Sequence, residues 1–177
     1  MLFLVLGSLL SAAPRNLRPH AALPTNAEAA PPLAPSDLAR LSPNALAYVG
    51  DAVLELFWRT RSVWPPGKLA SQQQNVVAAI RAETQARVLR ALVDRSGRDG
   101  EFALAENELG VFKRGRNACA RRGPLRLKAS VYQDASGLEA LVGYLYYADS
   151  ERCDALLAAL ARIHALPDYG EAPEGGR

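Results

Sequence analysis

Hydrophobic residues recur at steps of three and four along most of the chain between residues 36 and 166, and no stretch alternates as a half-buried strand does. This pattern predicts an all-α fold. The first helix is expected to begin at Ser42 and Pro43, a capping hydroxyl followed by a proline whose missing N–H costs nothing there. It should end near Arg61. Further helices are predicted over residues 69–94, 101–116, 136–148 and 151–166.

The first predicted helix has one apolar stripe and one polar face. The stripe that should be buried consists of Leu46, Val49, Val53, Leu56 and Phe57. The polar face consists of Asn44, Tyr48, Asp51 and Glu55. Because Gly50 and Ala52 flank Asp51, a neighbouring helix can approach it closely. A carboxylate in such a place needs a cation or hydrogen-bond donors. Asp51 therefore caps a nearby helix, pairs with an arginine, or belongs to a metal site.

A second acid lies in a similar setting on the helix predicted over residues 136–148. The stretch "DASGLEALVGYLYY" carries Glu139 among apolar residues, and Gly143 again allows close packing. If this helix packs on the first one, Asp51 and Glu139 converge on a divalent ion such as Mg²⁺, which prefers carboxylate oxygens and keeps several waters. The alternative is local, because Ser136-x-x-Glu139 has the spacing of a capping box at a helix start.

The segment between these helices is strongly basic. Residues 113–128, "KRGRNACARRGPLRLK", hold seven basic residues and no acid. Gly123 and Pro124 indicate that at least its later half is a loop. Such a cluster is typical of a surface that binds polyphosphate, although a solvated turn or a targeting-like run has the same composition.

The stretches "YVGDAVLEL" and "GLEALVGYLYY" resemble the two signature helices of the ribonuclease III endonuclease domain. With "VFKRGRNA" between them, the resemblance is closest to the minimal branch, Mini-ribonuclease III, and it covers residues 36–166. It implies a ribonuclease III-like helical bundle in which Asp51 and Glu139 are the metal-binding catalytic acids. It also implies RNA contacts, first from Lys113, Arg114, Arg116 and Asn117, then from Arg121, Arg122 and Arg126.

Two positions depart from full-length ribonuclease III, which has further acids four residues before the aspartate and three before the glutamate. Here these positions are Ala47 and Ser136. The minimal branch shows the same reduction, so the departure fits that branch but leaves the number of metal ions open. Glu55 and Asp134 lie near the candidate site in sequence and are expected to support it without being catalytic.

The resemblance implies a Mg²⁺-dependent endoribonuclease that cleaves double-stranded RNA and leaves 5′-phosphate and 3′-hydroxyl ends. Cutting both strands calls for two sites and hence a homodimer. Ribosomal RNA precursor is the expected substrate, with a ribosomal protein as a candidate helper. No double-stranded-RNA-binding domain is expected after Leu166. The alternatives are a non-catalytic, ribosome-associated or RNA-binding protein of the same fold, which retention of both acids disfavours, and a helical protein-interaction module with a basic surface.

Composition narrows these classes further. A chain of 177 residues with 49% hydrophobic content fits one domain with one core, and a net charge of +3 permits a polyanionic partner without requiring one. Cys119 and Cys153 have no partner at ligand spacing, which argues against a zinc site or a disulfide framework. His20 and His164 are isolated, which argues against histidine-based catalysis.

The N-terminus differs from the remainder. Residues 2–10, "LFLVLGSLL", resemble a secretory signal and are too short to span a bilayer. The Pro/Ala-rich stretch that follows has no acid before Glu28 and resembles a transit peptide. This order predicts a two-part presequence in residues 1–35, import into an algal plastid and no stable membrane association; secretion, another organelle or the cytoplasm are the alternatives. Residues 36–166 then form the nuclease domain, and 167–177 a disordered tail.

Overall fold

A computed structural model describes residues 33–96, 102–118 and 128–165. Within these ranges the regular structure is entirely helical, so the all-α prediction is confirmed. The helices are α1 Pro35–Leu38, α2 Pro43–Ser62, α3 Leu69–Ile80, α4 Ala82–Arg95, α5 Glu106–Ala118, α6 Ala129–Ala148 and α7 Ser150–His164. None of the helices in the described ranges has the length and apolar composition needed to cross a bilayer.

Helix α2 begins and ends close to where the sequence predicts. The Ser42 side chain caps it by accepting a hydrogen bond of 3.1 Å from the amide of Ala45. Leu46 and Val53 are buried as expected, but Leu56 is 39% exposed, so its place in the stripe was predicted wrongly. Leu54 is buried instead, because the face of α2 that meets α6 is centred on Gly50 and includes residue 54.

The helix predicted over residues 69–94 is in fact two helices, α3 and α4. Arg81 between them has an extended backbone, with φ −58° and ψ 141°. The break frees the carbonyl of Ile80, which accepts a hydrogen bond of 3.0 Å from the Gln85 side-chain amide. No proline or glycine lies at this position, and the helical spacing of apolar residues continues across it, so the sequence pattern does not indicate the break.

Helix α5 starts at Glu106, five residues later than predicted, and the Ala105 carbonyl accepts its first hydrogen bond, from the Leu109 amide at 2.9 Å. The Glu108 carboxylate accepts a hydrogen bond of 2.7 Å from the Ala105 amide. The same carboxylate binds Arg152 of α7, with Oε1 2.7 Å from Nε. This interaction lowers the pKa of Glu108 chiefly through the hydrogen bond from Arg152, and it ties the start of α5 to α7.

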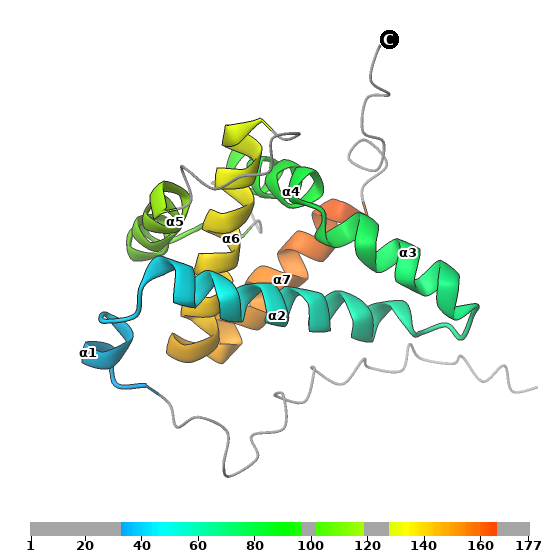
Figure 1. The fold of residues 1–177 in the computed structure, drawn as a ribbon, viewed down its shortest axis with the longest axis horizontal. Helices are drawn as coiled ribbons and strands as arrows, with labels where there is room; N and C mark the ends of the chain where they lie inside the picture. The colour runs from blue at the N-terminus through cyan, green and yellow to red at the C-terminus, as the bar shows by residue number, and fades with distance from the viewer. Residues whose placement is uncertain (1–32, 97–101, 119–127, 166–177) are drawn as a thin grey trace, which may run out of the picture.

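Helix α6 starts at Ala129, seven residues earlier than predicted. Ser136 is therefore a buried residue inside the helix, and the capping-box interpretation of Glu139 is wrong. Helix α6 runs through the middle of the fold, with α2 crossing in front of it and α5 at its side (Figure 1). Its buried residues Leu138, Leu141 and Val142 form the centre of the core together with residues of α2, α4 and α7.

Glycines set the distances at which α2 and α5 pack on α6. A Cβ on Gly50 would overlap the carbonyl oxygen of Glu139, and one on Gly143 would overlap that of Leu46, so the backbones of α2 and α6 are in contact. On the other side, a Cβ on Gly115 would lie 2.5 Å from the Cβ of Ala140. No larger residue fits at these crossings without moving a helix.

Alanine at either glycine of the α2–α6 crossing is expected to destabilise the protein. Gly50→Ala and Gly143→Ala force two backbones apart, at a cost of about 3 kcal/mol or more of unfolding free energy. Gly110→Ala is the matched control, because nothing lies within 4 Å of the added methyl in α5 and alanine favours a helix by about 0.5–1 kcal/mol. Urea denaturation measures all three. Equal unfolding free energies for Gly50→Ala and Gly110→Ala would contradict the close crossing.

Candidate active site

The structure brings Asp51 and Glu139 together, as the sequence predicted. Asp51 follows Gly50, whose Cα packs directly on the backbone of Glu139. The two acids therefore lie at the point where α2 and α6 are closest. Their charges interact, because the Asp51 carboxylate raises the pKa of Glu139.

The electrostatics of this pair are unfavourable without a cation. Burial is the main cause that raises the pKa of Glu139 to about 7, Asp51 adds to it, and a hydrogen bond from Gln85 opposes it. The pKa of Asp51 is raised as well, first by burial and then by the charge of Glu55. Within the described ranges no lysine or arginine lies at ion-pair distance from either acid, so the predicted alternative of an arginine partner for Asp51 is not found there.

Gln85 of α4 is a member of the site that sequence reasoning missed. It is only 5% exposed, and its Oε1 atom has no hydrogen-bond partner while its amide group serves Ile80 and Glu139. A signal was available, since Gln85 shares the apolar stripe of α4 with Val88, Leu89 and Leu92 at steps of three and four. A polar side chain on such a stripe needs a partner in the core.

Glu55 and Asp134, the expected supporting acids, lie in different surroundings. Glu55 accepts a hydrogen bond of 3.1 Å from Nε of Arg59, one turn along α2, and affects Asp51 only through its charge. Asp134 is buried and has arginines on both carboxylate oxygens, with Arg90 Nη2 2.7 Å from Oδ2 and Arg116 Nε 2.7 Å from Oδ1. Both of its oxygens thus serve cations of the protein, which departs from its expected role of supporting Asp51 and Glu139.

Four of the predicted RNA-contact residues lie in the last turns of α5. Lys113, Arg114 and Asn117 are exposed and Arg116 is half-buried. Gly115 packs against Ser136, Gly137 and Ala140 of α6. The basic end of α5 therefore packs on the residues of α6 that flank Glu139 in sequence. Arg121, Arg122 and Arg126, and the predicted loop around Gly123, lie outside the described residues.

The donor set at the α2–α6 crossing fits a hydrated Mg²⁺ ion. No group of three or more histidine, cysteine, aspartate or glutamate side chains gathers for a metal in the part of the chain that the structure describes. Mg²⁺ needs no such group, since one or two carboxylates suffice when waters complete its octahedron. Asp51 and Glu139 supply the carboxylates, and the unpartnered Oε1 of Gln85 is a further neutral oxygen nearby.

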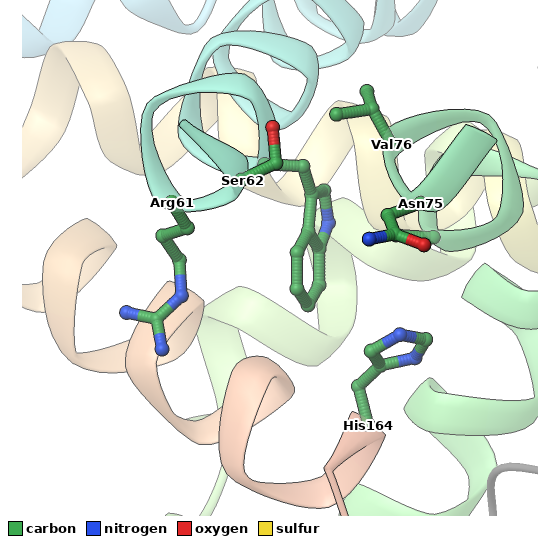
Figure 2. A pocket seen from close by; sticks show the side chains of 7 residues that line it. Arg61, Ser62, Asn75, Val76 and His164 are labelled. Atoms are coloured by element: carbon green, nitrogen blue, oxygen red, sulfur yellow. The ribbon is translucent and has the colours of Figure 1, made fainter. Parts of the chain in front are cut away.

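A separate pocket of about 280 Å³ opens between α2, α3 and α7 (Figure 2). It is lined by Trp58, Arg61, Ser62, Asn75, Val76, Ala79 and His164, so neither candidate acid contributes to it. The ring of His164 packs edge-on against Trp58, 4.9 Å between centroids. Burial, and then the charge of Arg87, lower the pKa of His164. His164 thus lies in a pocket apart from Asp51 and Glu139.

Comparison with known proteins places these features in one family. Residues 44–150 match the Ribonuclease III domain. The chain is 44% identical to Mini-ribonuclease 3 of Synechococcus over 128 residues, which cover 72% of this chain and 86% of the relative. It is 43% identical to Mini-ribonuclease 3 of Synechocystis over 127 residues, which cover 72% and 82%.

A solved structure is similar in fold. A protein of Fusobacterium nucleatum aligns with a TM-score of 0.59 over 72% of this chain and 94% of its own, at 22% sequence identity. That similarity, together with the domain match, confirms the predicted ribonuclease III-like helical bundle.

The raised pKa of Glu139 predicts a pH-dependent gain in stability for Glu139→Gln in metal-free protein. A folded-state pKa of about 7 against an unfolded value of 4.5 means that ionising Glu139 destabilises the fold. This penalty is absent below pH 4.5, grows as the pH rises to 7 and is complete above it. Glu139→Gln should therefore gain at most about 3 kcal/mol at alkaline pH and little in acid.

Urea denaturation in EDTA at pH values on both sides of this window measures the gain. Glu83→Gln, an exposed acid on α4, serves as the control and should show no such pH dependence. A gain for Glu139→Gln that stays constant across the window would contradict a raised pKa at a half-buried Glu139.

Proposed function

The chain is an endoribonuclease that belongs to the ribonuclease III family, within the Mini-ribonuclease 3 group, and we propose that it cleaves double-stranded RNA with the help of Mg²⁺. The observation that carries the proposal is the convergence of Asp51 and Glu139 at the α2–α6 crossing with no protein cation at ion-pair distance in the described ranges. Two carboxylates at one helix crossing, with Glu139 half-buried and its pKa raised by Asp51, create a demand for a positive ion.

Asp51 and Glu139 would hold the Mg²⁺ ion through their carboxylate oxygens, with Gln85 beside them. When bound, the ion supplies an activated water and stabilises negative charge on the phosphate and the leaving oxygen. The chain then needs no nucleophilic side chain of its own. Its acids orient the ion and its basic residues orient the RNA, and the expected products carry 5′-phosphate and 3′-hydroxyl ends.

The basic end of α5 provides the first set of RNA contacts. Lys113, Arg114 and Asn117 are exposed next to the stretch of α6 that carries Glu139. Side chains of this kind contact phosphates and 2′-hydroxyls, and they read the A-form shape more than the base sequence. Arg121 and Arg122 follow in the sequence and would extend the same contact.

A homodimer would supply the two sites needed to cut both strands. Tyr48 of α2 is 81% exposed and lies three residues before Asp51. Trp64, which follows α2, and Leu69, the first residue of α3, are 76% and 65% exposed. Large aromatic side chains on a surface are typical of protein interfaces. An interface at Tyr48 would bring the acid pairs of two protomers toward one duplex.

Ribosomal RNA precursor, with a ribosomal protein as helper, is the proposed substrate, and the plastid is the proposed compartment. The relatives at 43–44% identity are cyanobacterial proteins, which agrees with a plastid enzyme. The signal-like and transit-like composition of residues 1–35 supports import into that compartment.

Cleavage of a duplex RNA should require Mg²⁺ and both acids. The purified protein is expected to cut the duplex with Mg²⁺ and not with EDTA. Asp51→Asn and Glu139→Gln should abolish cutting while the protein still retards the duplex in a gel, because the basic residues remain. Asp154→Asn, which removes an exposed acid from α7, should cut normally. Undiminished cutting by Asp51→Asn would refute the assignment, and binding without cutting by the parent protein would favour the non-catalytic alternative.

The dimer proposal predicts a mass in solution of twice the 19.0 kDa chain. Tyr48→Asp should shift the protein toward monomer and reduce cutting of both strands of a duplex, since a charge would enter the interface. Val93→Asp, at an exposed apolar position of α4, is the control and should leave the mass unchanged. Light scattering after gel filtration measures both variants. A monomeric parent, or a Tyr48→Asp variant that stays dimeric, would count against this interface.

A further inference from the structure

One buried carboxylate holds two arginines from two different helices. Asp134 of α6 accepts hydrogen bonds from Nε and Nη2 of Arg90 of α4, at 3.1 and 2.7 Å, both on Oδ2. Arg116 of α5 approaches Oδ1, with its Nε at 2.7 Å and without hydrogen-bond alignment. Asp134 thus fixes Arg90 and Arg116 next to each other.

The positive charge of this cluster exceeds the negative charge by one unit. The carboxylate is buried, with 9% of its side chain exposed, whereas the side chains of Arg90 and Arg116 are 54% and 40% exposed. Arg90 uses two of its five guanidinium N–H groups on Asp134, and the others are left for a ligand. The two guanidinium groups are therefore held in place and face solvent, while the carboxylate that holds them is buried away from a ligand.

We propose that Arg90 and Arg116 form a phosphate-binding site for the RNA backbone, with Asp134 as the positioning residue that holds them. This inference rests on the proposed function, since the ligand is a phosphodiester of the bound duplex. Guanidinium groups suit phosphate because their planar N–H pairs match two phosphate oxygens. Arg90 thereby becomes an RNA contact on α4, outside the basic segment of residues 113–128.

The site lies along the same helix as the candidate catalytic acid. Asp134 precedes Glu139 by five residues of α6, which corresponds to about 7.5 Å along the helix axis. Lys113, one turn before Arg116 on α5, is exposed and extends the positive surface. Residues five apart are also turned by about 140° around the helix, so on the proposed function a duplex whose scissile phosphate lies at Glu139 meets the arginines with another phosphate of its backbone.

A purely structural ion network is the competing explanation, because Arg90, Asp134 and Arg116 also tie α4, α5 and α6 together. The two explanations differ in what they predict for RNA. A structural network affects stability and leaves binding by folded protein unchanged. A phosphate site changes the affinity and its dependence on salt, because each phosphate contact releases counterions.

Arg90→Gln tests the site in an Asp51→Asn background that binds without cutting. Arg116 still pairs with Asp134 in this variant, so the carboxylate keeps a partner. The logarithm of the association constant falls as the logarithm of the salt concentration rises, and for Arg90→Gln this slope should be less steep by about one. The Asp51→Asn protein should bind the duplex more tightly than its Arg90→Gln variant. The ratio of the two affinities should fall about fourfold as the salt concentration rises from roughly 50 to 200 mM. Arg162→Gln, an exposed arginine on α7, removes the same charge and should keep the parental slope. Equal slopes for the two variants would overturn the site.

Asp134→Asn tests the positioning role, because the loss of positioning and the change of charge alone predict opposite changes in RNA affinity. Removing a negative charge makes the protein more positive, so general electrostatics predicts tighter RNA binding. Loss of positioning predicts weaker binding per folded molecule, with circular dichroism confirming the fold. Unchanged or tighter binding would refute the role of Asp134.

The parent protein separates this inference from the proposed function. If the parent with intact Asp51 neither binds nor cuts duplex RNA, the proposed function fails before any arginine variant is compared. If the parent cuts and Arg90→Gln binds like Arg162→Gln, only the phosphate site fails.

Discussion

The backbone contact between α2 and α6 at Gly50 and Gly143 is the constraint on which the site depends. Because neither glycine has a Cβ, the carbonyl of Glu139 lies where a side chain of residue 50 would be. Asp51 comes next on α2, so the close crossing places its carboxylate near enough to Glu139 for the charge of Asp51 to raise the pKa of Glu139. A larger residue at the crossing would separate the helices and the acids together. The geometry of the acid pair is thus set by packing, and no flexible loop takes part in it.

This packing has an electrostatic cost that the rest of the fold offsets. Burial raises the pKa of both acids, Glu55 adds to it at Asp51 and Asp51 adds to it at Glu139, where the Gln85 amide gives only partial relief. The apolar core around Leu138, Leu141 and Val142 holds α6 in place despite this cost. Charged groups with perturbed pKa values in such settings are typical of functional sites. A bound Mg²⁺ would remove the repulsion, so the cost that the folded protein bears becomes affinity for the ion.

Much of this arrangement could be predicted from sequence because its causes are local. Ser42 and Pro43 mark the start of α2, and small residues beside Asp51 and Glu139 indicate a close helix crossing. The errors have tertiary causes. Arg81 breaks a helix without proline or glycine, and Ser136 has the spacing of a cap but lies inside α6. The arginines on Asp134 come from helices 44 and 18 residues away in the chain, and no local pattern specifies them.

The two acids of helix α6, Asp134 and Glu139, have opposite surroundings. On the proposals above, one of them positions arginines and the other binds a metal ion. Asp134 has a protein cation on each oxygen, so it has no need of a metal. Glu139 has no protein cation at ion-pair distance in the described ranges, so a metal is the partner that relieves it. Both lie on one rigid element buried in the core, and the spacing between metal ligands and arginines cannot drift with loop motion. On the proposed function, α6 therefore sets the distance between the phosphate that is cut and the one that is held.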